Sequence, residues 1–149
     1  MLLDIRQFIL RLTDGLSPAQ LRTIPDGERN HILWHLGHLV VTQQLLTYGL
    51  AGLPLLAPEA LVAQCRKGTA PADWDDEGPD PDEVKRLLVA LPQQFDADRA
   101  SGAFTDFREY PTSTGVVLRS LDDAVQFNLF HEGLHATSIA RQRRAVLGA

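Results

Sequence analysis

The sequence predicts an all-α fold, a four-helix bundle with long crossover connections, formed by a single domain over residues 1–149. Apolar residues recur every three or four positions in four long segments, which is typical of amphipathic helices. No segment shows convincingly the alternation of polar and apolar residues that is typical of strands. Stretches rich in proline and glycine separate these segments and predict two long connections, as in bundles whose sites form between facing helices.

The first half of the chain contains two of the four long helices. The first is expected over residues 2–13, where one face is apolar and Asp14-Gly15 ends the pattern. Ser17-Pro18 has the order of a capped start with proline in the first helical position, so one short turn of helix is expected there. The second long helix is expected over about residues 28–48 and ends at Gly49.

The first long connection and the third helix follow. Residues 51–79 contain four prolines and an acidic run, and they predict a connection with one short helix near residues 59–66. The third helix is expected to begin after Asp80 as its cap, with Glu83 reaching back to the cap residue. Pro92 is expected to bend or break this helix.

The last quarter of the chain predicts a second connection and the longest helix. Residues 101–117 form this connection, and any strand pair is expected at residues 104–110 and 115–119. Ser120, with Asp123 three residues later, is a capping pattern for a helix that runs to residue 147.

Charge and composition exclude several classes of protein. The net charge of −5 argues against a nucleic-acid binder, because phosphate contacts need a basic face. Residues 30–58 contain no charged side chain but carry a stripe of polar ones, so a buried helix is expected and no membrane span. The first residues predict no export signal, and the single Cys65 is expected to be an incidental thiol. We therefore expect a cytoplasmic protein.

The five histidines lie in two groups, and both groups fall within predicted long helices. His131 and His135 are four residues apart, so their rings project from one face of a helix and can hold one ion. His31, His35 and His38 share a broad face of the second helix, and any of them can supply a third ligand. The alternative is that these are surface or hydrogen-bonded core residues. Burying several imidazoles without partners is costly, however, and this favours a divalent ion with three nitrogen ligands and an open position.

Residues 131–135 also match H-E-x-x-H, in which the glutamate of zinc proteases activates water. The extended protease pattern is missing, because its further glycine and histidine are replaced here by Ser138 and Arg141. Glu132 therefore has two interpretations: a catalytic acid or base near the metal, or a structural residue.

Four more residues are candidates for the wall of a pocket. Trp34 and Phe127 lie one turn before His38 and His131, although aromatic residues at such positions more often belong to the core. The same helical offset places Thr42 and Asn128 near the site.

Two motifs resemble the DinB-like (DinB/YfiT) superfamily of metal-binding four-helix bundles. They are Asn30-x-x-x-Trp34-His35-Leu36-Gly37-His38-Leu39, and His131-Glu132-x-x-His135 followed by Arg143-Arg144-x-x-Leu147-Gly148. The resemblance implies a three-histidine site made by His38, His131 and His135, with His31 and His35 as accessory residues. It also implies a homodimer, and activities similar to those of transferases that use low-molecular-weight thiols, or of metal-dependent hydrolases.

The expected function is thus that of a cytoplasmic metalloenzyme acting on small molecules. One divalent ion is expected, zinc or nickel before iron, because three imidazoles suit each of these metals. Thiol S-transfer, with a low-molecular-weight thiol as cosubstrate, is the first hypothesis, and metal-dependent hydrolysis is the second. A non-catalytic stress-response or binding module stabilised by its metal is the third.

Overall fold

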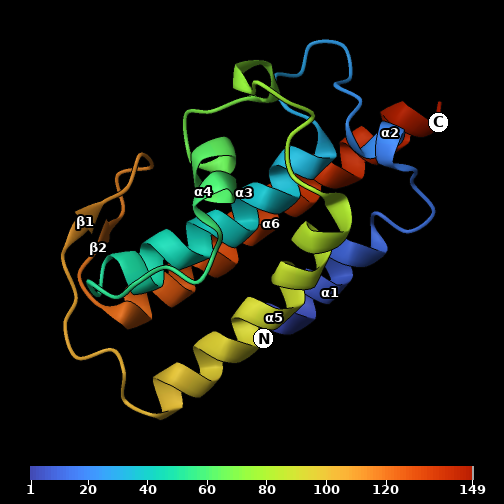
Figure 1. The fold of residues 1–149 in the computed structure, drawn as a ribbon. Coiled ribbons are helices and arrows are strands. Elements are labelled where there is room, and N and C mark those ends of the chain that lie inside the picture. Colours follow the sequence, from blue (N-terminus) through green and yellow to red (C-terminus); the bar gives the residue numbers. More distant parts are fainter. Residues whose placement is uncertain (149) are drawn as a thin grey trace.

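The computed structural model describes residues 1–148, and its architecture is a bundle of four long helices (Figure 1). These are α1 (Leu2–Arg11), α3 (Ile32–Gln44), α5 (Pro81–Ala100) and α6 (Leu121–Leu147). Both α1 and α3 contact α5 and α6, so apolar faces from all four helices meet at one core. The predicted all-α bundle is confirmed. Within residues 1–148, no helix combines the length and the apolar character needed to cross a bilayer.

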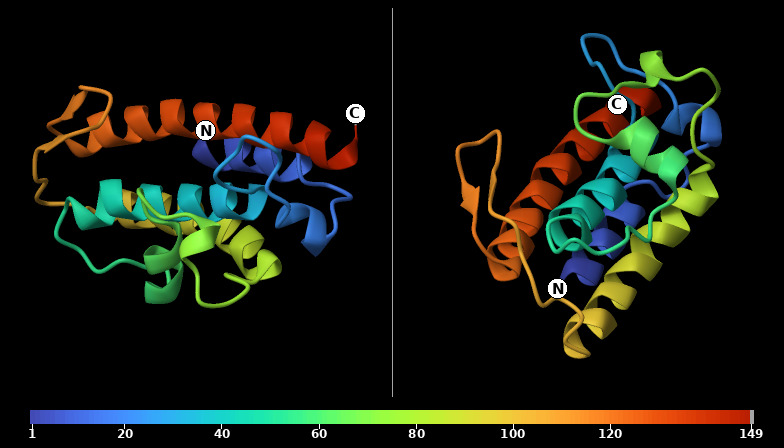
Figure 2. Two further views of the ribbon diagram at one scale, coloured as in Figure 1. Left: turned by 90° about the horizontal axis from the view of Figure 1, so that it is seen from above. Right: turned by 60° about the vertical axis from the view of Figure 1, so that its left-hand side comes forward.

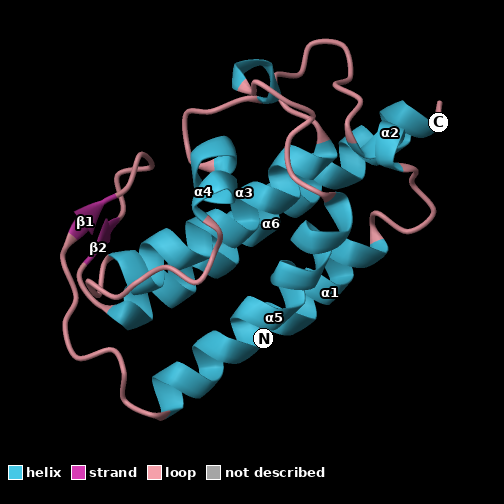
Figure 3. Cartoon of the chain, in the orientation of Figure 1, coloured by secondary structure: helices cyan, strands magenta, loops and turns pink. Residues whose placement is uncertain are grey.

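The short elements lie in the connections, as the sequence predicts (Figure 3). Two short helices are α2 (Pro18–Leu21) and α4 (Glu59–Cys65), and a 3₁₀ turn, η2, covers Pro71–Asp73. The strands β1 (Tyr110–Pro111) and β2 (Val117–Leu118) each have two residues and pair antiparallel in a short hairpin. Figure 2 shows this hairpin at one end of the bundle, beside the beginning of α6.

The second long helix begins later than expected, at residue 32 instead of 28. His31 is its N-cap, since the His31 Nδ1 accepts a hydrogen bond from the Trp34 backbone N–H at 3.0 Å. The predicted position of His31 on the face of the helix is therefore wrong, because an imidazole nitrogen satisfies a free N–H of the first turn. At its other end α3 continues as one π-helical turn, η1 (Leu45–Gly49).

Pro92 was expected to bend or break α5, and the break is wrong. The helix continues through Pro92 for eight more residues, because a proline removes one backbone hydrogen bond while Phe95 on the next turn is buried in the core. The expectation for Glu83 is wrong as well. Glu83 does not reach back to the cap. Its carboxylate accepts two hydrogen bonds of 2.7 Å from Arg86, while the Asp80 side chain accepts from the backbone N–H two residues later.

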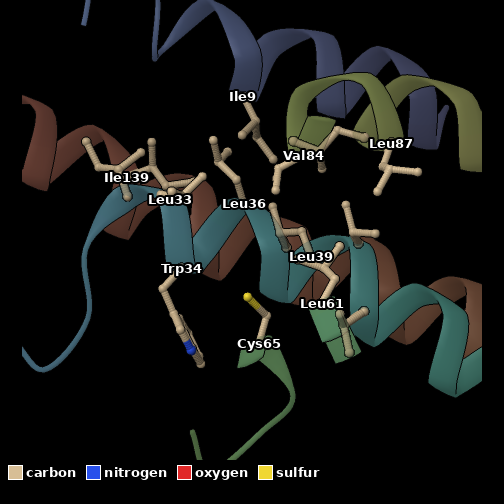
Figure 4. Close-up of a cluster of buried hydrophobic side chains, with 14 of the residues drawn as sticks. Ile9, Leu33, Trp34, Leu36, Leu39, Leu61, Cys65, Val84, Leu87 and Ile139 are labelled. Atoms are coloured by element: carbon tan, nitrogen blue, oxygen red, sulfur yellow. The ribbon is translucent and has the colours of Figure 1, made fainter. Parts of the chain in front are cut away.

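Helix α3 is enclosed on nearly every side, because α4 packs over the face that α5 and α6 leave open. Figure 4 shows Cys65 and Leu61 of α4 against this helix. The close approach depends on Gly37, where an added Cβ would lie 2.5 Å from the Cys65 Sγ. Burial raises the pKa of the Cys65 thiol to about 12, which makes it an unreactive packing residue.

Candidate metal centre

Three histidine rings converge where α3 packs against α6. The His131 Nε2 lies 3.2 Å from the His38 Nε2 and 3.1 Å from the His135 Nε2. One ligand atom from each ring lies within 4.8 Å of the other two. Nitrogens that bind one zinc ion in tetrahedral geometry at 2.0–2.1 Å are about 3.3 Å apart. The three side chains could therefore hold one metal ion, and they are the three that the sequence motifs indicate.

Two neighbours orient the His38 ring toward this cluster. The His38 Nδ1 lies 2.7 Å from the backbone oxygen of Cys65. A carbonyl oxygen only accepts, so Nδ1 carries the proton and the lone pair of Nε2 faces the other two histidines. The indole of Trp34 stacks on the imidazole, with ring centroids 4.6 Å apart and planes 11° apart. Trp34 is thus a buried packing residue behind a candidate ligand, so of its two interpretations the core one fits its contacts and it does not line the cavity.

His35 contacts the cluster from behind His135. The Nδ1 atoms of these two rings are 2.8 Å apart, and the His35 Nε2 lies 3.3 Å from the Gln142 side-chain nitrogen. For the His135 Nε2 to bind a metal, its Nδ1 must donate to His35. His35 was expected to be an accessory residue, and this contact agrees with that role. Histidines that bind a metal through one ring nitrogen usually donate a hydrogen bond from the other.

Burial keeps the imidazoles neutral. Desolvation lowers the pKa of His38, and together with the neighbouring histidines it lowers the pKa of His131 to about 3 and that of His135 to about 2. Desolvation also lowers the pKa of His35 to about 4. Neutral imidazole is the form that binds a metal, so the cluster needs no deprotonation at neutral pH.

Glu132 follows His131 in the chain but belongs to a different environment. Its Oε1 accepts hydrogen bonds from the Arg6 Nε at 3.1 Å and Nη2 at 2.9 Å, and from the Asn128 Nδ2 at 3.3 Å. The Arg6 Nη2 also donates to the Leu39 backbone oxygen at 2.7 Å. Arg6 and Glu132 are both 0% exposed. Burial raises the pKa of the Glu132 carboxyl and Arg6 opposes that shift, so the structural interpretation of Glu132 fits its contacts.

A cavity of about 590 Å³ reaches the cluster, and His38 and His131 form part of its wall. Thr42 and Phe127 line it, as expected, and the Thr42 hydroxyl lies 3.3 Å from the His38 Nε2. Asn128 does not line it and lies beside Glu132 instead, so its predicted place in the pocket is wrong. Most of the wall is apolar and includes Leu45, Leu46, Leu50, Leu53, Leu55 and Phe130.

Sequence reasoning missed two sets of residues around this centre. Arg6 carried a signal, because it lies on the apolar face of the first helix three residues before Ile9. Lys67 and Arg108, which also line the cavity, come from the two long connections and carried no local signal.

The family model of the DinB superfamily matches residues 1–139. This range includes both helical segments that carry the three clustered histidines. No curated protein is significantly similar to the chain.

Proposed function

This chain belongs to the DinB superfamily, and we propose that it is a metal-dependent enzyme that transfers a small thiol to an electrophilic small molecule. The convergence of the His38, His131 and His135 Nε2 atoms carries the metal part of the proposal. The cavity that reaches two of these rings supports catalysis, because structural zinc sites have four protein ligands and no open position. Zinc or nickel is the expected metal, and iron is the next candidate.

The chain supplies three imidazole ligands and a mainly apolar surface beside them. A divalent ion held by three neutral imidazoles lowers the pKa of a thiol or water in its open position. The stacked Trp34 and the Cys65 carbonyl hold the His38 ring so that its lone pair faces the site. The Thr42 hydroxyl can hydrogen-bond a ligand next to His38, and the leucine wall offers an apolar surface beside it.

Metal-dependent hydrolysis is the weaker alternative. In the H-E-x-x-H mechanism the glutamate accepts a proton from water. Here the Oε1 of Glu132 is bonded to Arg6 and Asn128, and the residue lies outside the wall of the cavity. Thiol transfer needs no such base, because the metal itself favours the thiolate.

The metal content of tag-free protein tests the first part of the proposal. We expect about one equivalent of metal per chain by plasma mass spectrometry, lost in His38→Ala and in His135→Ala. His31→Asn is the matched control, because His31 lies outside the cluster and asparagine keeps an acceptor for the N-cap. Folded protein that stays metal-free after incubation with zinc and nickel would overturn the proposal.

Cobalt substitution separates an enzyme from a non-catalytic module. An open site should change its visible spectrum when small thiols are added, whereas a site that does not exchange would favour a purely stabilising metal. Turnover of a thiol with an electrophile by the zinc or nickel form is then the direct assay. The expected homodimer and the cytoplasmic location stay predictions, and light scattering checks the first.

A further inference from the structure

The cavity beside the three histidines has a positive rim. Lys67 and Arg108 both line it, and no aspartate or glutamate does. Both side chains are exposed, and neither forms an ion pair within residues 1–148. The chain as a whole carries a net charge of −5, so two unpaired cations at one cavity differ from the general character of the protein. An anion at this rim would meet attraction without a competing carboxylate in the wall.

The two cations come from the two long connections. Lys67 follows α4 in the first connection. Arg108 lies just before β1 in the second, and its backbone N–H donates to the Leu50 oxygen at 2.8 Å. That bond attaches the second connection to the end of η1, where the apolar wall of the cavity lies. The crossovers of the bundle thus build the charged rim, while α3 and α6 supply the histidines.

Leucine and phenylalanine side chains form the largest share of the remaining wall of the cavity. Its volume of about 590 Å³ is in the range of pockets that enclose small organic molecules. Tyr110, Thr112 and Thr114 of the hairpin also line it. The wall therefore combines a metal-ligand cluster, an apolar surface and a cationic rim.

We propose that the electrophilic substrate has an apolar body and an anionic group, with the apolar body on the leucine wall and the anion at Lys67 and Arg108. This inference rests on the proposed function, since that function places the reacting end of the substrate at the three histidines. A carboxylate is the simplest anion of this kind, because lysine and arginine side chains both pair with it. Uncharged electrophiles of the same shape are then poorer substrates.

Octanoate and octan-1-ol are suitable probes, since they share the apolar chain and differ in charge. Their binding to the metal-loaded protein is measured by calorimetry at low ionic strength. In the double variant Lys67→Gln, Arg108→Gln we expect octanoate to bind about tenfold more weakly, about threefold for each exposed cation. Octan-1-ol should bind with unchanged affinity. Salt should weaken octanoate binding to the wild-type protein because the cations are exposed.

The matched control is Lys85→Gln, Arg144→Gln, which removes the same two charges outside the cavity. Equal octanoate affinity in both double variants would overturn the inference. The same would follow if octan-1-ol lost as much affinity as octanoate, since the effect would then be one of shape. Loss of octanoate binding on metal removal, without any effect of the rim substitutions, would place the carboxylate at the metal and also overturn it. Metal content measured in parallel shows separately whether the proposed function itself fails.

Discussion

Replacing Arg6 by methionine would leave the Glu132 carboxylate buried and without its partner charge. Arg6 donates two hydrogen bonds to the Glu132 Oε1 and one to the Leu39 oxygen, and both members of the pair are inaccessible to solvent. Methionine fills similar space but provides none of these donors. The substitution therefore tests how much of the fold depends on a single contact between α1 and α6.

The size of the effect follows from this burial. Removing one partner of a buried ion pair costs about 3–5 kcal/mol, because a charge remains without compensation. A domain of this size is stable by about 5–15 kcal/mol, so Arg6→Met should lose a large share of its unfolding free energy. The double variant Arg6→Met, Glu132→Leu removes both charges and should be clearly more stable than Arg6→Met alone.

Urea unfolding followed by far-ultraviolet circular dichroism measures these differences on the metal-free protein. The reasoning is refuted if the double variant loses as much stability as the single variants Arg6→Met and Glu132→Leu lose when their effects are added. The same variant tests the role of Glu132 in catalysis. If it folds and binds metal normally but loses more than about a hundredfold in turnover, Glu132 is a catalytic acid or base after all.

Two further predictions concern the centre of the bundle. Gly37→Ala should destabilise the protein by about 1–3 kcal/mol, because the new methyl group meets the Cys65 Sγ, and adding Cys65→Ala should recover part of the loss. Thermal unfolding measures the stability of both variants. A Gly37→Ala protein that is more stable than wild type would contradict the close approach of α3 and α4. The metal-free protein should also lose stability as the pH falls. Burial lowers the pKa of His31 and of His35 from 6.5 to about 4, so the unfolded chain takes up protons first. Each of these two rings then lowers the unfolding free energy by about 2 kcal/mol between pH 7 and pH 5. If urea titrations instead gave the same unfolding free energy at pH 7 and pH 5, the prediction would be contradicted. The two histidines would then take up protons in the folded protein as readily as in the unfolded chain.

Local sequence patterns determined most of the helices and two of the three histidines in the candidate metal centre. The Ser120 cap and Gly148 set the limits of α6, because capping depends on groups only a few residues away. The same short-range geometry places His131 and His135 on one face, since residues four apart on a helix are neighbours. The spacing of the remaining histidines left the third ligand open, and only the family resemblance selected His38.

The tertiary structure decided everything that depends on contacts between distant segments. Packing of α3 against α6 brings His38 into the cluster and leaves His35 behind it. Glu132, which the sequence shows only as part of the H-E-x-x-H motif, pairs with Arg6, 126 positions away. The cationic rim is likewise assembled from two separate crossovers. Helical periodicity determines which face a residue occupies, but the angle and depth at which helices pack determine what that face meets.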